Sequence, residues 1–214
     1  MNADAMNAID AIQPPRPIAA PRPAAQATAF PGLGELIRLT EEALGQRDCT
    51  AIVATLRARL PALIARHRGA LGGEFLRADP QRRRRVELHH CPVLGYQILA
   101  MIWGPGQGTP IHDHHELWGV ESTWHGELLV ADFQPTTVAG ELVRLEPRDA
   151  VCMRTGEALG LTPEQGLHLC RNPSQREVAV TVHIYARALD RFNLYVDAGD
   201  GWYRRREYCP ETEY

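Results

Sequence analysis

The sequence predicts a mainly β domain, a small barrel or sandwich, preceded by helices and a flexible N-terminal arm. From about residue 84, short runs rich in Val, Ile, Leu, Thr and Tyr are separated by Gly and Pro, as in GYQILAMIW and EVAVTVHIYA. Six or more such runs at this spacing are typical of all-β barrels and sandwiches. Residues 33–67 instead carry apolar side chains at helical spacing. This change of period predicts a helical lead-in to the β domain.

The N-terminal segment differs in composition from the rest of the chain. Residues 1–30 are rich in Pro and Ala and hold few bulky apolar side chains, so we expect a flexible arm. Residues 31–214 then form a single domain, with helices at 33–67. Asp48 is a suitable N-cap for the second helix, and Pro61 is expected to break or restart it. The tail from Leu189 onward alternates only weakly, and we expect it along the edge of the barrel.

Composition excludes several classes of protein. The 214 residues are 44% apolar with a net charge of −3, enough for one core and too little positive charge for a nucleic-acid face or a polybasic membrane tether. No apolar run approaches the roughly 18–20 residues that span a bilayer, and the N-terminus does not read as a secretory signal. Five scattered cysteines without a Cys-x-x-Cys pair favour reduced thiols. We therefore expect a cytoplasmic protein that binds neither nucleic acid nor membrane.

Residues 103–119, WGPGQGTPIHDHHELWG, place three histidines within four positions. Alternation along a strand puts His112 and His114 on one face. Two neighbouring imidazoles form half of a metal site. Exposed His-x-His pairs also occur without a metal, so this pair alone leaves both interpretations open.

The wider spacing favours a metal site. A glycine, five residues and the pair His112-x-His114 follow the first cupin motif, Gly-x5-His-x-His-x4-Glu-x6-Gly, except that Gly119 stands at the glutamate position. The second motif fits PEQGLHLCRN, which brings His168 about 50 residues later. The sequence therefore predicts a cupin, a small β-barrel or jelly roll, with His112, His114 and His168 as metal ligands.

The missing glutamate bears on the chemistry of the site. Three neutral imidazoles leave a divalent ion its full charge and one open face, which suits an anionic ligand such as a thiolate with O2 beside it. Imidazole ligands suit Zn, Cu, Fe and Ni, so a zinc-dependent hydrolase or isomerase remains an alternative. A non-catalytic cupin that binds and senses a small ligand is a second alternative. No DNA-binding helix pair is evident in residues 33–67, which counts against a regulator.

The segments WGPGQGTPIHDH, GLHLCRNPS and VTVHIYA, together with Gly119, resemble the cysteine dioxygenase family of cupins over about residues 35–190. The likeness is to its bacterial thiol dioxygenases. The resemblance implies one non-haem Fe(II) per chain, held by His112, His114 and His168. It also implies that a small carboxylated thiol, such as cysteine, 3-mercaptopropionate or a dicarboxylic thiol, reacts with O2 to give a sulfinic acid.

The same family has a Ser-His-Tyr relay on a late strand, which corresponds here to Thr181, His183 and Tyr185. Threonine keeps the hydroxyl, and the two-residue spacing places all three on one strand face. On this resemblance Tyr185, oriented by His183, donates a hydrogen bond to the reacting oxygen or sulfur. A packing role for this tyrosine and histidine is the alternative. Gly119 stands where mammalian members have the cysteine that crosslinks to the tyrosine, so no crosslink is expected.

The family grips the substrate carboxylate with an arginine or a glutamine on an early strand, which corresponds here to RRRRVELHHC. This segment holds no glutamine after Gln81. We therefore expect an arginine fork, with Arg85 as the substrate-binding residue and Arg83 as the second candidate. A solvated run of four arginines is the alternative. Asn172 and Trp103 are expected to support the site.

Overall fold

The lead-in consists of two helices that were expected from residues 33–67. The computed structural model describes residues 29–163 and 166–213. In it, α1 (Leu33–Leu44) and α2 (Cys49–His67) are followed by a short 3-10 helix, η3 (Arg68–Ala70). Asp48 caps α2 as predicted, because its carboxylate accepts a hydrogen bond of 2.8 Å from the Ala51 N–H.

The prediction that Pro61 breaks the second helix is wrong. α2 runs through Pro61 without interruption, although a proline inside a helix costs one backbone hydrogen bond and about 3 kcal/mol. Leu60, Leu63 and Ile64 on either side are buried in the core. Their packing holds the helix together, since tertiary burial outweighs local propensity.

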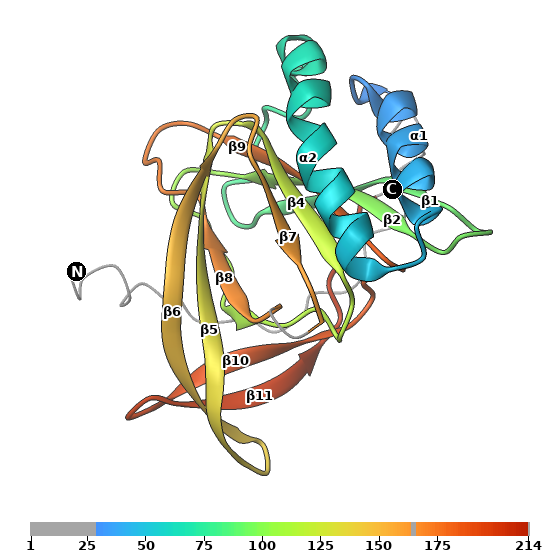
Figure 1. The fold of residues 1–214 in the computed structure, drawn as a ribbon. Coiled ribbons are helices and arrows are strands. Elements are labelled where there is room, and N and C mark those ends of the chain that lie inside the picture. Colours follow the sequence, from blue (N-terminus) through green and yellow to red (C-terminus); the bar gives the residue numbers. More distant parts are fainter. Residues whose placement is uncertain (1–28, 164–165, 214) are drawn as a thin grey trace.

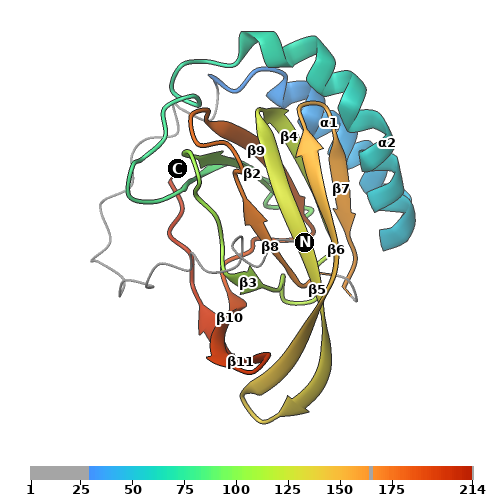
Figure 2. The ribbon, with the colours of Figure 1, turned by 90° about the vertical axis from the view of Figure 1, so that its left-hand side faces the viewer.

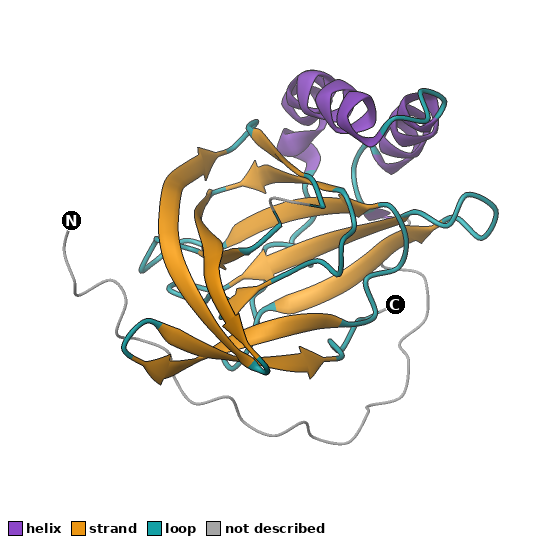
Figure 3. Ribbon diagram, turned by 60° about the horizontal axis from the view of Figure 1, so that its bottom comes forward, coloured by secondary structure: helices purple, strands orange, loops and turns teal. Residues whose placement is uncertain are grey.

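Eleven strands make up the rest of the described chain: β1 (Arg84–His90), β2 (Gln97–Trp103), β3 (Ile111–His112), β4 (Gly119–His125), β5 (Glu127–Ala139), β6 (Leu142–Arg154), β7 (Ala158–Leu161), β8 (His168–Arg171), β9 (Ala179–Tyr185), β10 (Phe192–Gly199) and β11 (Trp202–Tyr208). One sheet has the order β1-β2-β9-β4-β7, and the other strands close in the order β10-β11-β6-β5-β8-β3. The strands wrap around a common interior, with the helices outside it (Figure 3). The fold is therefore mainly β, a cupin barrel with a helical lead-in, as predicted.

β6 is one long strand, because it pairs with β5 along most of its length and register shifts in β5 absorb the irregularity. The expectation for the tail needs correction. The tail lies along an edge only at its end, where Glu213 bridges to Val86 of the edge strand β1. β10 pairs with β3 and β11 pairs with β6, so these two strands are part of the barrel wall, at the end of the molecule opposite the helices (Figures 1 and 2).

The central strands β2 and β9 are buried along their whole length, because the helices cover one face of their sheet and the barrel interior lies on the other. Ile98, Val182 and Ile184 belong to the core beneath α1 and α2. The residues between them, such as Leu99 and Tyr185, face the barrel interior. The period of two therefore sends alternate side chains of β9 into the interior, where the functional groups lie.

The N-terminal boundary of the domain lies before residue 31. Phe30 is 3% exposed and makes edge contacts with Phe75 and Trp124, at centroid distances of 5.0 and 4.7 Å. Its aromatic ring thus belongs to the core beneath the helices. Residues 1–28 of the expected arm lie outside the described residues. Among the described helices, none has the length and apolarity required to cross a membrane.

Candidate metal centre

The three histidines predicted as ligands meet in the barrel interior. His112 ends β3 and lies opposite His168 of β8 in the strand register, and His114 follows two residues after β3. Their ring centroids are 4.7–5.1 Å apart, and one nitrogen from each lies within 4.8 Å of the others. The side chains are 8%, 2% and 0% exposed, respectively for His112, His114 and His168. The structure therefore brings together residues from two distant parts of the sequence.

Backbone carbonyls fix which ring nitrogens of His112 and His114 carry protons. The Nδ1 atom of His112 lies 3.1 Å from the Pro110 carbonyl oxygen, and that of His114 lies 2.8 Å from the Gly166 carbonyl oxygen. A carbonyl only accepts, so each Nδ1 carries the hydrogen and each Nε2 keeps a lone pair. This orientation by outer partners is usual for metal-binding histidines.

The Nε2 atoms have the state that metal binding requires. His114 Nε2 and both ring nitrogens of His168 are buried without a hydrogen-bond partner. Burial lowers the pKa of His112 and His114, and it lowers the pKa of His168 to about 4, so all three imidazoles are neutral near pH 7. Neutral, unpartnered imidazole nitrogens buried together fit a metal ion of the class that nitrogen ligands prefer.

A carboxylate that the sequence did not predict, Glu121, lies beside the three histidines. This residue of β4 is 0% exposed, and its Oε1 atom lies 3.6 Å from His168 Nε2 and 3.8 Å from His114 Nε2. Burial alone would raise the pKa of Glu121, but the imidazoles of His183 and His168 hold it below its ordinary value. Gly119 and Glu121 share one strand face. That period of two was the signal in the sequence that could have identified Glu121.

The relay residues form a continuous chain of hydrogen bonds along β9. The Trp103 indole N–H donates to the Thr181 hydroxyl at 2.9 Å, Thr181 Oγ1 lies 2.7 Å from His183 Nε2, and His183 Nδ1 lies 3.0 Å from the Tyr185 hydroxyl. Tyr185 also stacks on His114 at a centroid distance of 5.6 Å. Burial raises the pKa of Tyr185 well above its ordinary value, so this phenol stays protonated beside the three histidines.

Both candidate arginines reach the same small cavity. Arg83, Arg85, His112, Tyr185 and Glu121 all line it, and its volume is about 40 Å³. Arg85 is 9% exposed, and its guanidinium donates to the Leu189 carbonyl at 2.7 Å and to the Thr212 hydroxyl. The Arg83 guanidinium lies over the Trp103 ring, 5.9 Å from its centroid. The run of four arginines is therefore not simply a solvated face.

Asn172 supports the site by tying together the ends of β2 and β8. It is 0% exposed, and its amide donates to the Trp103 carbonyl at 3.2 Å and to the Glu177 carbonyl at 2.8 Å. Trp103 is thereby fixed at both its backbone and its indole. These contacts agree with the supporting roles expected for the two residues.

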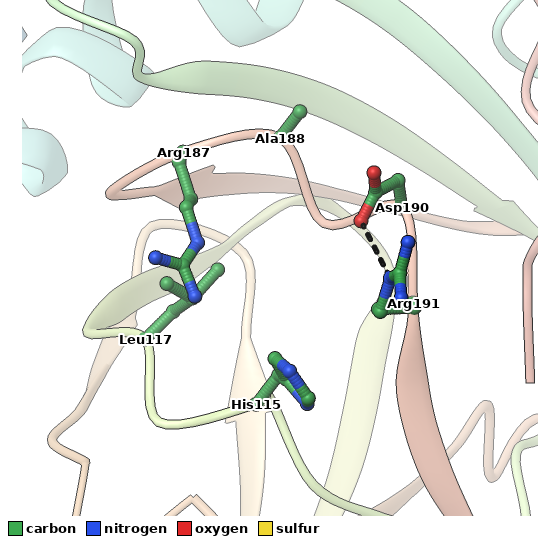
Figure 4. Close-up of a pocket in the computed structure, with 6 residues that line it drawn as sticks. All are labelled: His115, Leu117, Arg187, Ala188, Asp190 and Arg191. Carbon is green, nitrogen blue, oxygen red and sulfur yellow. Dashed lines mark ion pairs between the residues drawn. The ribbon is translucent and has the colours of Figure 1, made fainter. Parts of the chain in front are cut away.

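A second pocket, of about 270 Å³, lies on the surface next to the segment that carries His114. It is lined by His115 and Leu117, which follow His114, and by residues 187, 188, 190 and 191, which follow β9. The Arg187 guanidinium points toward Leu117, and Asp190 pairs with Arg191 at 3.8 Å (Figure 4). None of the residues predicted for the site lines this pocket. It is larger than the cavity lined by His112 and Tyr185, but none of its lining residues is among those with buried unpartnered side-chain atoms.

Comparison with known proteins identifies relatives of the chain. A family profile described as "Cysteine dioxygenase type I" matches residues 70–198. The curated relatives include cysteine dioxygenase type 1 of Rattus norvegicus, 27% identical over 101 residues, and that of Homo sapiens, 28% identical over 101 residues. Each match covers 47% of this chain and 49% of the relative, so the chain spans about half the length of the curated relatives it matches.

Solved structures also resemble the chain. An uncharacterized conserved protein with a double-stranded β-helix domain from Klebsiella pneumoniae is 17% identical, with 58% of this chain and 94% of that chain covered and a TM-score of 0.42. A cupin protein from Desulfovibrio desulfuricans is 20% identical, with 52% and 90% covered and a TM-score of 0.36. Similarity at these TM-scores bears on neither the site nor the activity.

Proposed function

The chain belongs to the cysteine dioxygenase type I family, and from this premise we propose that it is an Fe(II)-dependent thiol dioxygenase. Its substrate would be a small carboxylated thiol, such as cysteine or 3-mercaptopropionate, and its product a sulfinic acid. One observation carries the proposal: the imidazoles of His112, His114 and His168 gather in the barrel interior, and the small cavity that His112 lines is also lined by Tyr185 and by two arginines. These groups would hold a metal, donate a proton and bind an anionic substrate.

In this proposal His112, His114 and His168 hold one Fe(II) per chain. When bound, iron supplies the deprotonation of the coordinated thiol and the electronic coupling that lets a thiolate react with O2. The overall reaction balances as RSH + O2 → RSO2H. The sulfur is oxidised by four electrons, O2 accepts them, and both oxygen atoms end on sulfur. No other reductant is consumed, so the substrate and O2 are the only small-molecule partners.

Tyr185 would be the group that holds a proton at the reacting atoms. Because Trp103 already donates to the Thr181 oxygen, the threonine hydroxyl is best placed to donate to His183 Nε2. His183 Nδ1–H then donates to the Tyr185 oxygen, and the phenol hydrogen is directed into the cavity. This row of hydrogen bonds would keep the phenol donor in one orientation. Such a positioned donor contributes typically 10²–10⁴-fold to a rate.

Arg85, with Arg83 beside it, would bind the carboxylate of the substrate. A guanidinium fork matches a carboxylate with two parallel hydrogen bonds. The cavity of about 40 Å³ has room for roughly three waters on the scale of one water per ~10–15 Å³. This size supports a thiol of a few heavy atoms rather than a peptide or a nucleotide.

The composition-based expectations on location and partners stay predictions. A cytoplasmic location is supported by the five described cysteines, which are all free thiols. The net charge of −3 supports the prediction that neither nucleic acid nor membrane is a partner.

An oxygen electrode tests the proposed function. Apo protein is loaded anaerobically with Fe(II) or with Zn(II), and O2 uptake is followed with cysteine, 3-mercaptopropionate, mercaptosuccinate and a thiol that lacks a carboxylate. We expect uptake only with iron, and fastest with a carboxylated thiol. A zinc form that hydrolyses a substrate while the iron form leaves every thiol untouched would contradict the proposal and favour the metal-dependent hydrolase.

A further inference from the structure

The position that the cupin motif gives to glutamate is filled here by a tyrosine ring. A Cβ atom added at Gly119 would lie 2.8 Å from Cδ1 and 3.0 Å from Cε1 of Tyr185, so no side chain fits there without moving the ring. Glu121 is the next residue on the same strand face. It lies opposite His183 in the β4–β9 register and is completely buried. A carboxylate thus lies beside His114 and His168, at a position two residues after the one that the motif gives to glutamate.

The two oxygens of this carboxylate have different surroundings. Glu121 Oε2 lies 3.9 Å from the Cys170 thiol, which donates to it. Glu121 Oε1 lies 3.0 Å from His183 Nδ1, but this contact does not have the geometry of a hydrogen bond. The nearby imidazole nitrogens His114 Nε2 and His168 Nε2 make no hydrogen bond either. A buried polar atom without a partner costs about 1–3 kcal/mol, and more when it is charged. Three such atoms gathered at one point indicate a ligand that would satisfy all of them together.

The separations fit a shared cation better than a direct ion pair. At 3.6 and 3.8 Å, the Oε1–Nε2 distances are too long for hydrogen bonds. Two ligands of one metal, each bonded at about 2.0–2.2 Å with an angle of about 110–120°, are about 3.3–3.8 Å apart. His183 Nδ1 is nearer to Oε1, at 3.0 Å, but the hydrogen bond of that nitrogen goes to the Tyr185 hydroxyl. We propose that Glu121 is a fourth ligand of the metal held by His112, His114 and His168.

This assignment changes what the site accepts. Three imidazoles and one carboxylate reduce the net charge of a divalent ion to +1, so a single thiolate neutralises it. A fourth protein ligand also leaves fewer open positions than three imidazoles would. The site then favours substrates that attach through sulfur alone and gain nothing from an amino group. The assignment depends on the proposed function only for the choice of metal.

Cobalt(II) binding tests the assignment without any turnover. Apo protein is titrated anaerobically with Co(II), and the dissociation constant and the visible d–d absorption are recorded for the wild type, Glu121→Gln and Asp132→Asn. Asp132 is the matched control, because it is a partly exposed carboxylate opposite His168 in the register. We expect Glu121→Gln to weaken binding by at least about tenfold and to alter the absorption bands, with Asp132→Asn close to the wild type. Equal weakening in both variants, or an unchanged spectrum in Glu121→Gln, would overturn the assignment.

If Glu121→Gln does not fold, a crystal structure of the Co(II)-loaded wild type decides. A Glu121 oxygen at about 2.0–2.2 Å from the metal supports the assignment. A carboxylate turned away to His183 refutes it. A cobalt site that needs Glu121 in a protein that oxidises no thiol would refute the proposed function alone, and a thiol dioxygenase indifferent to Glu121→Gln would refute only this assignment.

Discussion

Replacing Arg85 with alanine removes a guanidinium from the wall of the metal cavity. The guanidinium is held in place, because it donates to the Leu189 carbonyl at 2.7 Å and to the Thr212 hydroxyl. It shares the cavity with His112 and Tyr185. A thiol bound through sulfur alone would pivot, so a fixed cation in the same cavity would hold its carboxylate and keep the sulfur in reacting geometry.

The size of the effect follows from the type of interaction lost. A hydrogen bond to a charged group contributes about 1.5–3 kcal/mol, which corresponds to a rise in KM of roughly tenfold to 150-fold. We therefore expect Arg85→Ala to raise the apparent KM for 3-mercaptopropionate at least about tenfold. The KM of a matched thiol without a carboxylate should not change, because that thiol makes no contact with the guanidinium.

Initial rates of O2 uptake measure both KM values, and Arg84→Ala is the control. Arg84 points to the other face of β1 and pairs with Glu213 at 2.8 Å, so it also ties the strand to the C-terminal segment. Thermal unfolding of both variants reports any shared loss of stability. If Arg85→Ala affects the two thiols equally, or affects neither, the reasoning fails and the carboxylate is anchored elsewhere. The same pair of assays on Arg83→Ala then tests the other guanidinium.

Three further predictions follow from the same geometry. Tyr185→Phe should retain the metal but lower turnover by roughly 10²–10⁴-fold, and unchanged turnover would reduce this tyrosine to a packing role. Gly119→Ala should lower stability by about 1–3 kcal/mol, because its Cβ meets the Tyr185 ring at 2.8 Å; a thermal midpoint equal to the wild type would contradict the close packing. His168→Ala should abolish binding of the one iron per chain, and elemental analysis that still finds stoichiometric iron would remove His168 from the ligand set.

Sequence reasoning was successful where local spacing decides geometry. The period of two along a strand places Thr181, His183 and Tyr185 on one face, and they form one chain of hydrogen bonds. The spacing of the histidine motifs also identified residues that meet in space. In these cases the spacing of residues within a short motif decides which side chains face the interior.

The features that were missed depend on packing between distant segments. Pro61 stays helical because of the core beneath it. The tail closes the barrel because β10 pairs with β3 and β11 pairs with β6. The weak alternation of apolar residues in the tail does not predict these pairings. Glu121 was overlooked because the motif directed attention to Gly119. The Tyr185 ring fills the space in front of that glycine, and this packing between β4 and β9 is not visible in the sequence.

The fate of molecular oxygen tests the central proposal most directly. Iron-loaded protein is incubated with 3-mercaptopropionate or cysteine under ¹⁸O2 in unlabelled water, and the product is analysed by mass spectrometry. We expect a sulfinic acid in which both oxygen atoms carry the label. A product that contains oxygen from water, a disulfide as the only oxidised species, or no consumption of any thiol would contradict it.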